Sequence, residues 1–215
     1  MVQEVGPAFK STFTAPVVSE LVSAARRGVK NALSNFSAEK GSDALTFGVD
    51  VYAFVWHELE LLAAAGGEGW GLEKDHQVRR LVIGEYRLAC HRVGDRASDN
   101  IYECFPNNGG AVVATAKNQL QLFPFHKLAT HAREVVLCLL ANPATGLEGV
   151  YICIPGLANG AQITAWACAH EIFLRDEDEQ NGTTAAPRGG TPIPPENTPP
   201  AQVRPKARPA QHDTA

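Results

Sequence analysis

The residues best suited to do chemistry are Cys168, His170 and Glu171, which fall within one short stretch of the chain. A cysteine acts as a nucleophile when its thiolate is paired with a positioned imidazole. Residues two apart on a strand point to the same face, so Cys168 and His170 would share a face with Glu171 adjacent. This group is the best nucleophile candidate, and a packed core thiol is the competing interpretation of Cys168.

The other cysteines are Cys90, Cys104, Cys138 and Cys153. The total of 5 is odd and no pair has C-x-x-C spacing, which argues against a disulfide scaffold or a zinc ribbon. Each cysteine lies in an apolar run, where a free thiol behaves as a small buried hydrophobe. We therefore expect reduced thiols and a cytoplasmic location.

One cysteine pair has a spacing that predicts a contact. If residues 94–100 form the loop of a hairpin, Val93 faces Ile101 and Cys90 faces Cys104. Directly opposed residues of an antiparallel pair are close enough for a disulfide under oxidising conditions. The sequence thus predicts that Cys90 and Cys104 lie side by side.

The histidines do not form a recognisable metal motif. In the run WHELEL, His57 and Glu58 match the start of H-E-x-x-H, but Leu61 stands where the second histidine is required. His126 and His131 are five residues apart, so they would not share one side of a helix. Glycine-rich phosphate loops are also absent. We therefore expect no metal and no cofactor.

Two basic clusters are candidates for contacts with nucleic-acid phosphates. They are Arg26, Arg27 and Lys30 in the first third of the chain, and Arg204, Lys206 and Arg208 near its end. Aromatic residues do not interleave with either cluster, so base stacking is not indicated. The net charge of -4 argues against extensive phosphate binding, and a solvated helix face and a solubilising tail are the competing interpretations.

Hydrophobic periodicity predicts two helices in the first part of the chain. The first runs from Pro16 to Phe36, with apolar residues on one side and the basic cluster on the other. The second runs from about Val49 to Ala65 and ends at a glycine pair. A short helical piece from Lys74 to Arg80 is a further possibility.

After Leu81 the apolar pattern changes to a period of two, which predicts strands. The expected strands are Tyr86 to His91, Ile101 to Phe105, Ala111 to Lys117, Leu120 to Leu122, Val135 to Leu140 and Val150 to Ile154. The segment from Ala161 to Leu174 fits a helix about as well as a strand. Helices followed by strands at hairpin spacing predict an α+β fold, with two N-terminal helices and a mainly antiparallel sheet of five or six strands.

The composition separates a body from a tail. Residues 1–174 have the apolar content of a globular domain, and no apolar run approaches the length of a membrane span. Residues 175–215 begin with the acidic run RDEDE and contain eight of the 14 prolines. This composition predicts a disordered tail, with a P-x-x-P unit at residues 192–195 as a candidate protein-binding element.

The composition and the tail also carry a resemblance. The chain is rich in alanine and proline, and its compact front is followed by the sequence TPPAQVRPKARPAQ. In these respects it resembles the proline-alanine-rich, genome-associated proteins of capsidless fungal RNA viruses. The resemblance covers mainly the tail and the overall composition, and the chain departs from those proteins in having few serines. It implies a structural role in coating RNA, and it assigns no site residue.

The sequence therefore favours a non-enzymatic α+β protein that self-associates or binds a partner. We expect a second copy of the chain as the main partner, with RNA and a protein that binds the Pro-rich tail as further candidates. The alternative is a small enzyme, a hydrolase or transferase, that uses Cys168, His170 and Glu171.

Overall fold

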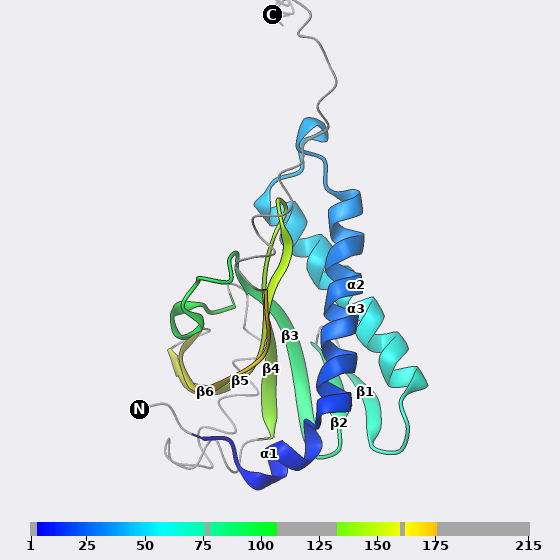
Figure 1. The fold of residues 1–215 in the computed structure, drawn as a ribbon, viewed down its shortest axis with the longest axis vertical. Coiled ribbons are helices and arrows are strands. Elements are labelled where there is room, and N and C mark those ends of the chain that lie inside the picture. Colours follow the sequence, from blue (N-terminus) through cyan, green and yellow to red (C-terminus); the bar gives the residue numbers. More distant parts are fainter. Residues whose placement is uncertain (1–3, 76–77, 107–132, 160–161, 176–215) are drawn as a thin grey trace, which may run out of the picture. The chain divides into compact units, whose positions relative to one another are not determined.

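The computed structural model describes residues 4–75, 78–106, 133–159 and 162–175. In these ranges three α-helices precede six strands (Figure 1). The helices are α1 (Pro7–Thr12), α2 (Ala15–Asn35) and α3 (Ala44–Ala65), and two short 3-10 turns are η1 (Ala38–Lys40) and η2 (Ile101–Glu103). The strands are β1 (Trp70–Asp75), β2 (Val78–Ile83), β3 (Tyr86–Gly94), β4 (Glu134–Asn142), β5 (Gly146–Asn159) and β6 (Gln162–Leu174).

The strands form one six-stranded sheet in the order β1-β2-β3-β4-β5-β6. Every neighbouring pair is antiparallel except β3 and β4, which run parallel. The expected α+β class and mostly antiparallel sheet are confirmed. None of the helices in the described ranges is long and apolar enough to cross a membrane.

The two long helices match the expected ones, with one difference at the start of α3. α2 begins and ends within a residue of the expected bounds, whereas α3 begins five residues before Val49. The reason is a cap, because the Asp43 carboxylate accepts a hydrogen bond from the Thr46 backbone N–H at 2.8 Å. The earlier start adds Leu45 to the helix, which becomes important for its outer surface.

Three expectations about the strands need correction or completion. The helical piece at Lys74 to Arg80 is wrong, because β1 extends through Asp75, β2 begins at Val78, and Lys74 pairs with Arg79. The strand at Ile101 to Phe105 is also wrong. Its first residues form η2, whose start is capped by a hydrogen bond from the Tyr102 N–H to the Asn100 side chain at 3.2 Å. The ambiguous segment near the end of the body is β6, and the expected strands at 111–117 and 120–122 lie outside the described residues.

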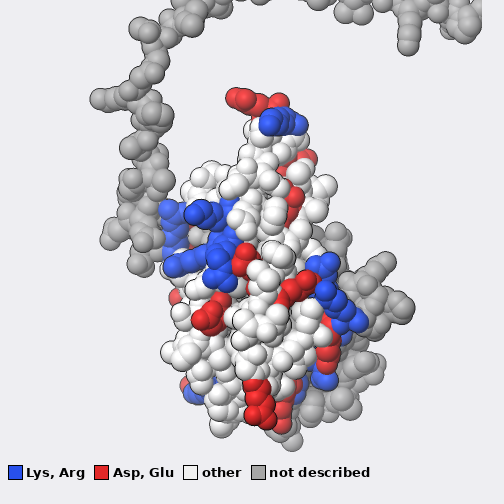
Figure 2. All heavy atoms as spheres, turned by 90° about the vertical axis from the view of Figure 1, so that its right-hand side faces the viewer, with Lys and Arg blue, Asp and Glu red and all other residues white. Residues whose placement is uncertain are grey.

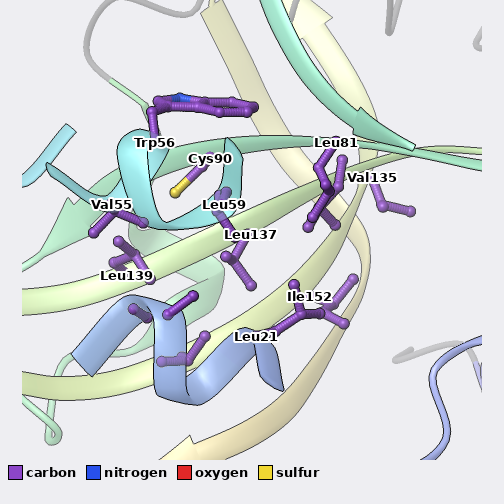
Figure 3. Packing of buried hydrophobic residues seen from close by; sticks show 14 of the residues in the cluster. Leu21, Val55, Trp56, Leu59, Leu81, Cys90, Val135, Leu137, Leu139 and Ile152 are labelled. Carbon is purple, nitrogen blue, oxygen red and sulfur yellow. The ribbon is translucent and has the colours of Figure 1, made fainter. Parts of the chain in front are cut away.

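α2 and α3 pack together against one face of the sheet, with α1 at one end (Figure 1). Their buried side chains meet those of β3, β4 and β5 in a cluster that we call the helix-side core (Figure 3). Figure 3 shows Val55 of α3 beside Leu139, Leu59 of α3 beside Leu137, and Leu21 of α2 near Ile152. β4 is buried on both faces, as its continuously apolar sequence predicts.

The opposite face of the sheet carries a second, smaller cluster that we call the far-side core. It consists of Ala89, Ile101, Val136, Cys138, Leu140, Tyr151, Cys153, Ile163 and Trp166. The indole N–H of Trp166 donates to the backbone oxygens of Ile101 at 3.1 Å and Cys104 at 3.0 Å, which fixes the η2 segment over the sheet. The sheet therefore has a hydrophobic core on each side.

Candidate functional site

β6 positions the three residues of the candidate nucleophile group on different faces of the sheet. Cys168 belongs to the helix-side core, and the His170 ring lies on the same side, 5.4 Å from the ring of Phe9. Glu171 pairs with Tyr151 in the register, and the Tyr151 hydroxyl lies 3.4 Å from its carboxylate on the far side. The expected shared face of Cys168 and His170 is present, but Glu171 points away from both.

The electrostatics of this group favour a packed thiol. Burial raises the pKa of Cys168 to about 11, so the thiol is protonated at neutral pH. Burial also lowers the pKa of His170, and the nearby Lys10 lowers it further. A thiolate nucleophile needs a lowered thiol pKa and an oriented imidazole, and the arrangement on β6 has neither feature. The geometry does not favour the enzyme alternative.

The predicted contact between Cys90 and Cys104 is wrong. Cys90 is buried in the helix-side core, whereas Cys104 packs against the far-side core. The reason is that β3 is followed by η2 rather than by the second strand of a hairpin, and β3 instead pairs with the parallel strand β4. The sheet therefore separates the two thiols.

Two other cysteines do lie close together. Cys138 pairs with Tyr151 and Cys153 with Val136, so the two cysteines are diagonal neighbours on adjacent strands. Burial, with a contribution from a hydrogen bond to Cys153, raises the pKa of Cys138 well above its usual value. All five cysteines are free thiols. Both side chains belong to the far-side core, where a free thiol packs as a small apolar group.

The described residues contain no group of three or more His, Cys, Asp or Glu side chains arranged to hold a metal ion. His57 is exposed on α3, and Glu58 is buried and pairs with Arg27 of α2. His126 and His131 lie outside the described residues.

The basic residues of α2 differ in their surroundings. The Arg27 Nε lies 2.6 Å from the Glu58 carboxylate, so its charge is paired between the helices. The Arg26 guanidinium lies over the ring of Phe173 at 4.4 Å, and Lys30 is exposed. On the face that Figure 2 shows, basic side chains form separate groups with acidic ones between them. Arg204, Lys206 and Arg208 lie outside the described residues.

The most unusual described surface is the outer side of α3. Its exposed residues are Ala44, Leu45, Thr46, Val49, Ala53, His57, Leu61, Ala64 and Ala65, and none is an acid, lysine or arginine. Five of them lie four positions apart: Leu45, Val49, Ala53, His57 and Leu61, which we call the α3 stripe. Leu45 is 73% exposed, Val49 59% and Leu61 52%. Each step of four residues turns about 40° around the helix axis, so the five side chains form an inclined row across the outer side of the helix.

The sequence reasoning missed the α3 stripe, although a signal was present. The periodicity marked Val51, Phe54, Val55, Leu59 and Leu62 as the apolar face and started the helix at about Val49, which left Leu45 out. The helix is apolar on its outer side as well as its inner side, and such helices are usually covered all round.

No protein-family model matches the chain, and no curated protein and no solved structure matches it either.

A half-buried histidine is the second feature that the sequence did not reveal. The ring of His91, on β3, lies 6.1 Å from the ring of Tyr52 on α3. Burial lowers the pKa of His91 to about 4, so the imidazole is neutral at pH 7. The residue acts as part of the packing between α3 and the sheet, and it makes this packing sensitive to acid.

Proposed function

We propose that this protein is a non-enzymatic structural or interaction protein that self-associates through the α3 stripe. The observation that carries the proposal is an exposed helix surface, from Leu45 to Leu61, that has large apolar side chains and no formal charge. An exposed apolar patch of this kind on a folded domain marks an interaction surface.

The pattern of the stripe favours a second copy of the chain as the occupant. A two-fold interface requires a patch that is complementary to itself. The positions of the stripe are symmetric about Ala53, so antiparallel α3 helices that cross there bring Val49 of one copy toward His57 of the other. Leu45 and Leu61 then lie at the two edges of the contact, and the half-buried Asp50 follows Val49 in the sequence. The small Ala53 side chain permits close approach of the helices at their crossing.

The expected association is reversible. Burying the exposed parts of Leu45, Val49 and Leu61 contributes about 1 kcal/mol per side chain. Both copies contribute, but the loss of translational and rotational freedom offsets much of the gain. We therefore expect a dimer whose population depends on protein concentration.

RNA coating is the more specific version of this proposal, and it is supported by the resemblance in composition and by the basic residues of the chain. Assembly would bring the cations of several copies together, which one copy with a net charge of -4 does not achieve. The ratio of absorbance at 260 and 280 nm in the purified protein tests this version. Association without nucleic acid would retain the structural proposal and reject the RNA version.

Light scattering coupled to size exclusion, over a series of concentrations, tests the self-association. We expect the mass of the full chain to rise toward a dimer with concentration. Val49→Glu places a charge within the stripe, next to its central residue Ala53, and should leave a monomer. Ser19→Glu is the matched control, because Ser19 is exposed on α2, and it should behave like the unchanged chain. Circular dichroism shows whether both variants are folded. A chain that stays monomeric at all concentrations, or equal association of both variants, would overturn the proposal.

A further inference from the structure

The end of β6 is fixed beside the turn that joins β4 and β5. The Arg175 backbone N–H donates to the backbone oxygen of Glu148 at 2.9 Å. The Arg175 guanidinium donates to the backbone oxygen of Thr145 at 2.6 Å. The guanidinium also lies 3.3 Å from the Glu148 carboxylate. After Arg175 the sequence continues with Asp176, Glu177, Asp178 and Glu179. Four carboxylates therefore follow immediately after a well-defined point on the body.

α2 runs alongside this part of β6. The Arg26 guanidinium stacks on Phe173, three residues before Asp176. Near the C-terminal end of α2, Leu33 approaches the β4–β5 turn, since a side chain at Gly146 would lie 3.1 Å from it. The end of β6, from Phe173 to the β4–β5 turn, therefore lies along α2 in the direction from Arg26 to Leu33. Lys30 lies between these two levels, one helical turn after Arg26 and on the same side of the helix.

The two cations on this side of α2 lack a carboxylate partner within the described ranges. Arg27 pairs with Glu58, but no ion pair joins Arg26 or Lys30 to an acid that the structure describes. We propose that Arg26 and Lys30 form a docking surface for the chain's own acidic run, Asp176 to Glu179. Charge complementarity and chain continuity together select this occupant over a separate molecule.

The distances permit this contact. Three residues span at most about 10 Å, so Asp176 stays near Phe173 and the Arg26 that stacks on it. Lys30 is about 6 Å farther along the helix axis. The next three carboxylates extend the reach past this lysine. The local concentration of carboxylates beside Arg26 and Lys30 is therefore far higher than that of any free anion.

The contact has a consequence for polyanions. Arg26 and Lys30 belong to the cluster that the sequence nominates for RNA phosphates. A docked acidic run would neutralise these cations, so RNA would have to displace the run before it could bind there. The acidic run thus acts as a built-in competitor that limits binding of phosphate polymers to α2. This inference does not depend on the α3 stripe.

Carbodiimide crosslinking, which joins a lysine directly to a carboxylate, tests the contact in the full chain. We expect a peptide that links Lys30 to residues 176–179. Lys10 on α1 is the control, because it is exposed and lies at the other end of α2. Mixing isotope-labelled and unlabelled chains separates links within a chain from links between chains. The Val49→Glu variant should give the same link. Equal yields at Lys10 and Lys30, or links only between chains, would overturn the inference.

Binding of poly(U) tests the competition. The variant D176N/E177Q/D178N/E179Q should bind poly(U) roughly two- to fivefold more tightly at low salt, the range expected for losing one exposed ion-pair contact. The tail variant E196Q/D213N is the control, because it removes acidic charges outside the run. Adding Lys30→Glu to the first variant should abolish the gain. An equal gain in both neutralised variants would show a general charge effect and would count against docking.

Discussion

α2 and α3 are nearly equal in length, with 21 and 22 residues, and they pack against each other on the same face of the sheet, but their solvent-facing sides differ. The exposed residues of α2 are mostly polar: Ser19, Glu20, Arg26, Arg27, Lys30, Asn31, Ser34 and Asn35, with Ala15 and Pro16 at its start. The exposed residues of α3 carry no acid, lysine or arginine. α2 has the surface of a helix that faces water, whereas α3 has the surface of a helix that is covered.

The difference shows that packing within one chain does not account for the apolar outer surface of α3. Both helices supply apolar side chains to the helix-side core, so their inner sides play the same structural role. The outer apolar residues of α3 contribute nothing to this core. Solubility disfavours such residues, and a second copy that covers the stripe provides a physical reason for them.

The largest expected effect separates the inner and outer sides of α3. Leu59 is fully buried, so Leu59→Ala should lower the free energy of unfolding by about 3 kcal/mol through lost burial and a cavity. Leu61→Ala truncates the same side chain two residues away, on the outer side, and should change the stability of the monomer by less than about 0.5 kcal/mol. Urea unfolding at low protein concentration measures both values. A large loss for Leu61→Ala in the monomer would mean that the outer side is covered within one chain.

The sequence was sufficient for the elements with strong local patterns. The period of 3.6 residues predicts α2, and the continuous apolar run predicts β4 as a strand buried on both faces. The segment of β6 stayed ambiguous because Ile163, Trp166 and His170 have the spacing of a helix, while Cys168 and His170, two residues apart, fit one face of a strand. Only pairing with β5, which is not a local property, selects the strand.

The remaining errors have the same physical origin. β1 contains Lys74 and β2 contains Arg79, and charged residues of this kind do not favour strands. In the fold, however, the Lys74 ammonium and the Arg79 guanidinium both pair with the Glu60 carboxylate of α3. The parallel pairing of β3 and β4 separates Cys90 from Cys104, and no local pattern encodes it. For the candidate site, the shared face of Cys168 and His170 followed from strand geometry. The exposure of α3 did not, because it depends on which side the sheet covers.

The next effect concerns the contact between α3 and β3, and it depends on pH. The pKa of His91 is about 4 in the folded protein, against about 6.5 in the unfolded chain. Between these values the unfolded chain binds a proton that the folded protein does not, so stability falls as the pH falls through this window. The expected loss is about 2 kcal/mol from pH 7 to pH 5.

Urea unfolding at several pH values, with His91→Gln as the comparison, isolates this contribution. The variant should be less stable at pH 7 but should lose less stability on acidification, because glutamine does not titrate. His170, whose pKa is also lowered, remains in both proteins and cancels. Parallel pH profiles of the two proteins would show that His91 is not the group responsible.

Two glycine substitutions test how closely the two helices approach; their expected effects differ in sign, and the second is the smallest. A Cβ at Gly28 of α2 would lie 2.6 Å from the Val55 Cα of α3, which is backbone and cannot move without shifting the helix. Gly28→Ala should therefore cost about 2 kcal/mol despite the better helix propensity of alanine. A Cβ at Gly48 of α3 would meet only the end of the Arg92 side chain at 3.4 Å, so Gly48→Ala should stabilise the protein by about 0.5 kcal/mol. Thermal unfolding of both variants gives the comparison. Stabilisation by Gly28→Ala would mean that α2 and α3 do not touch at this point.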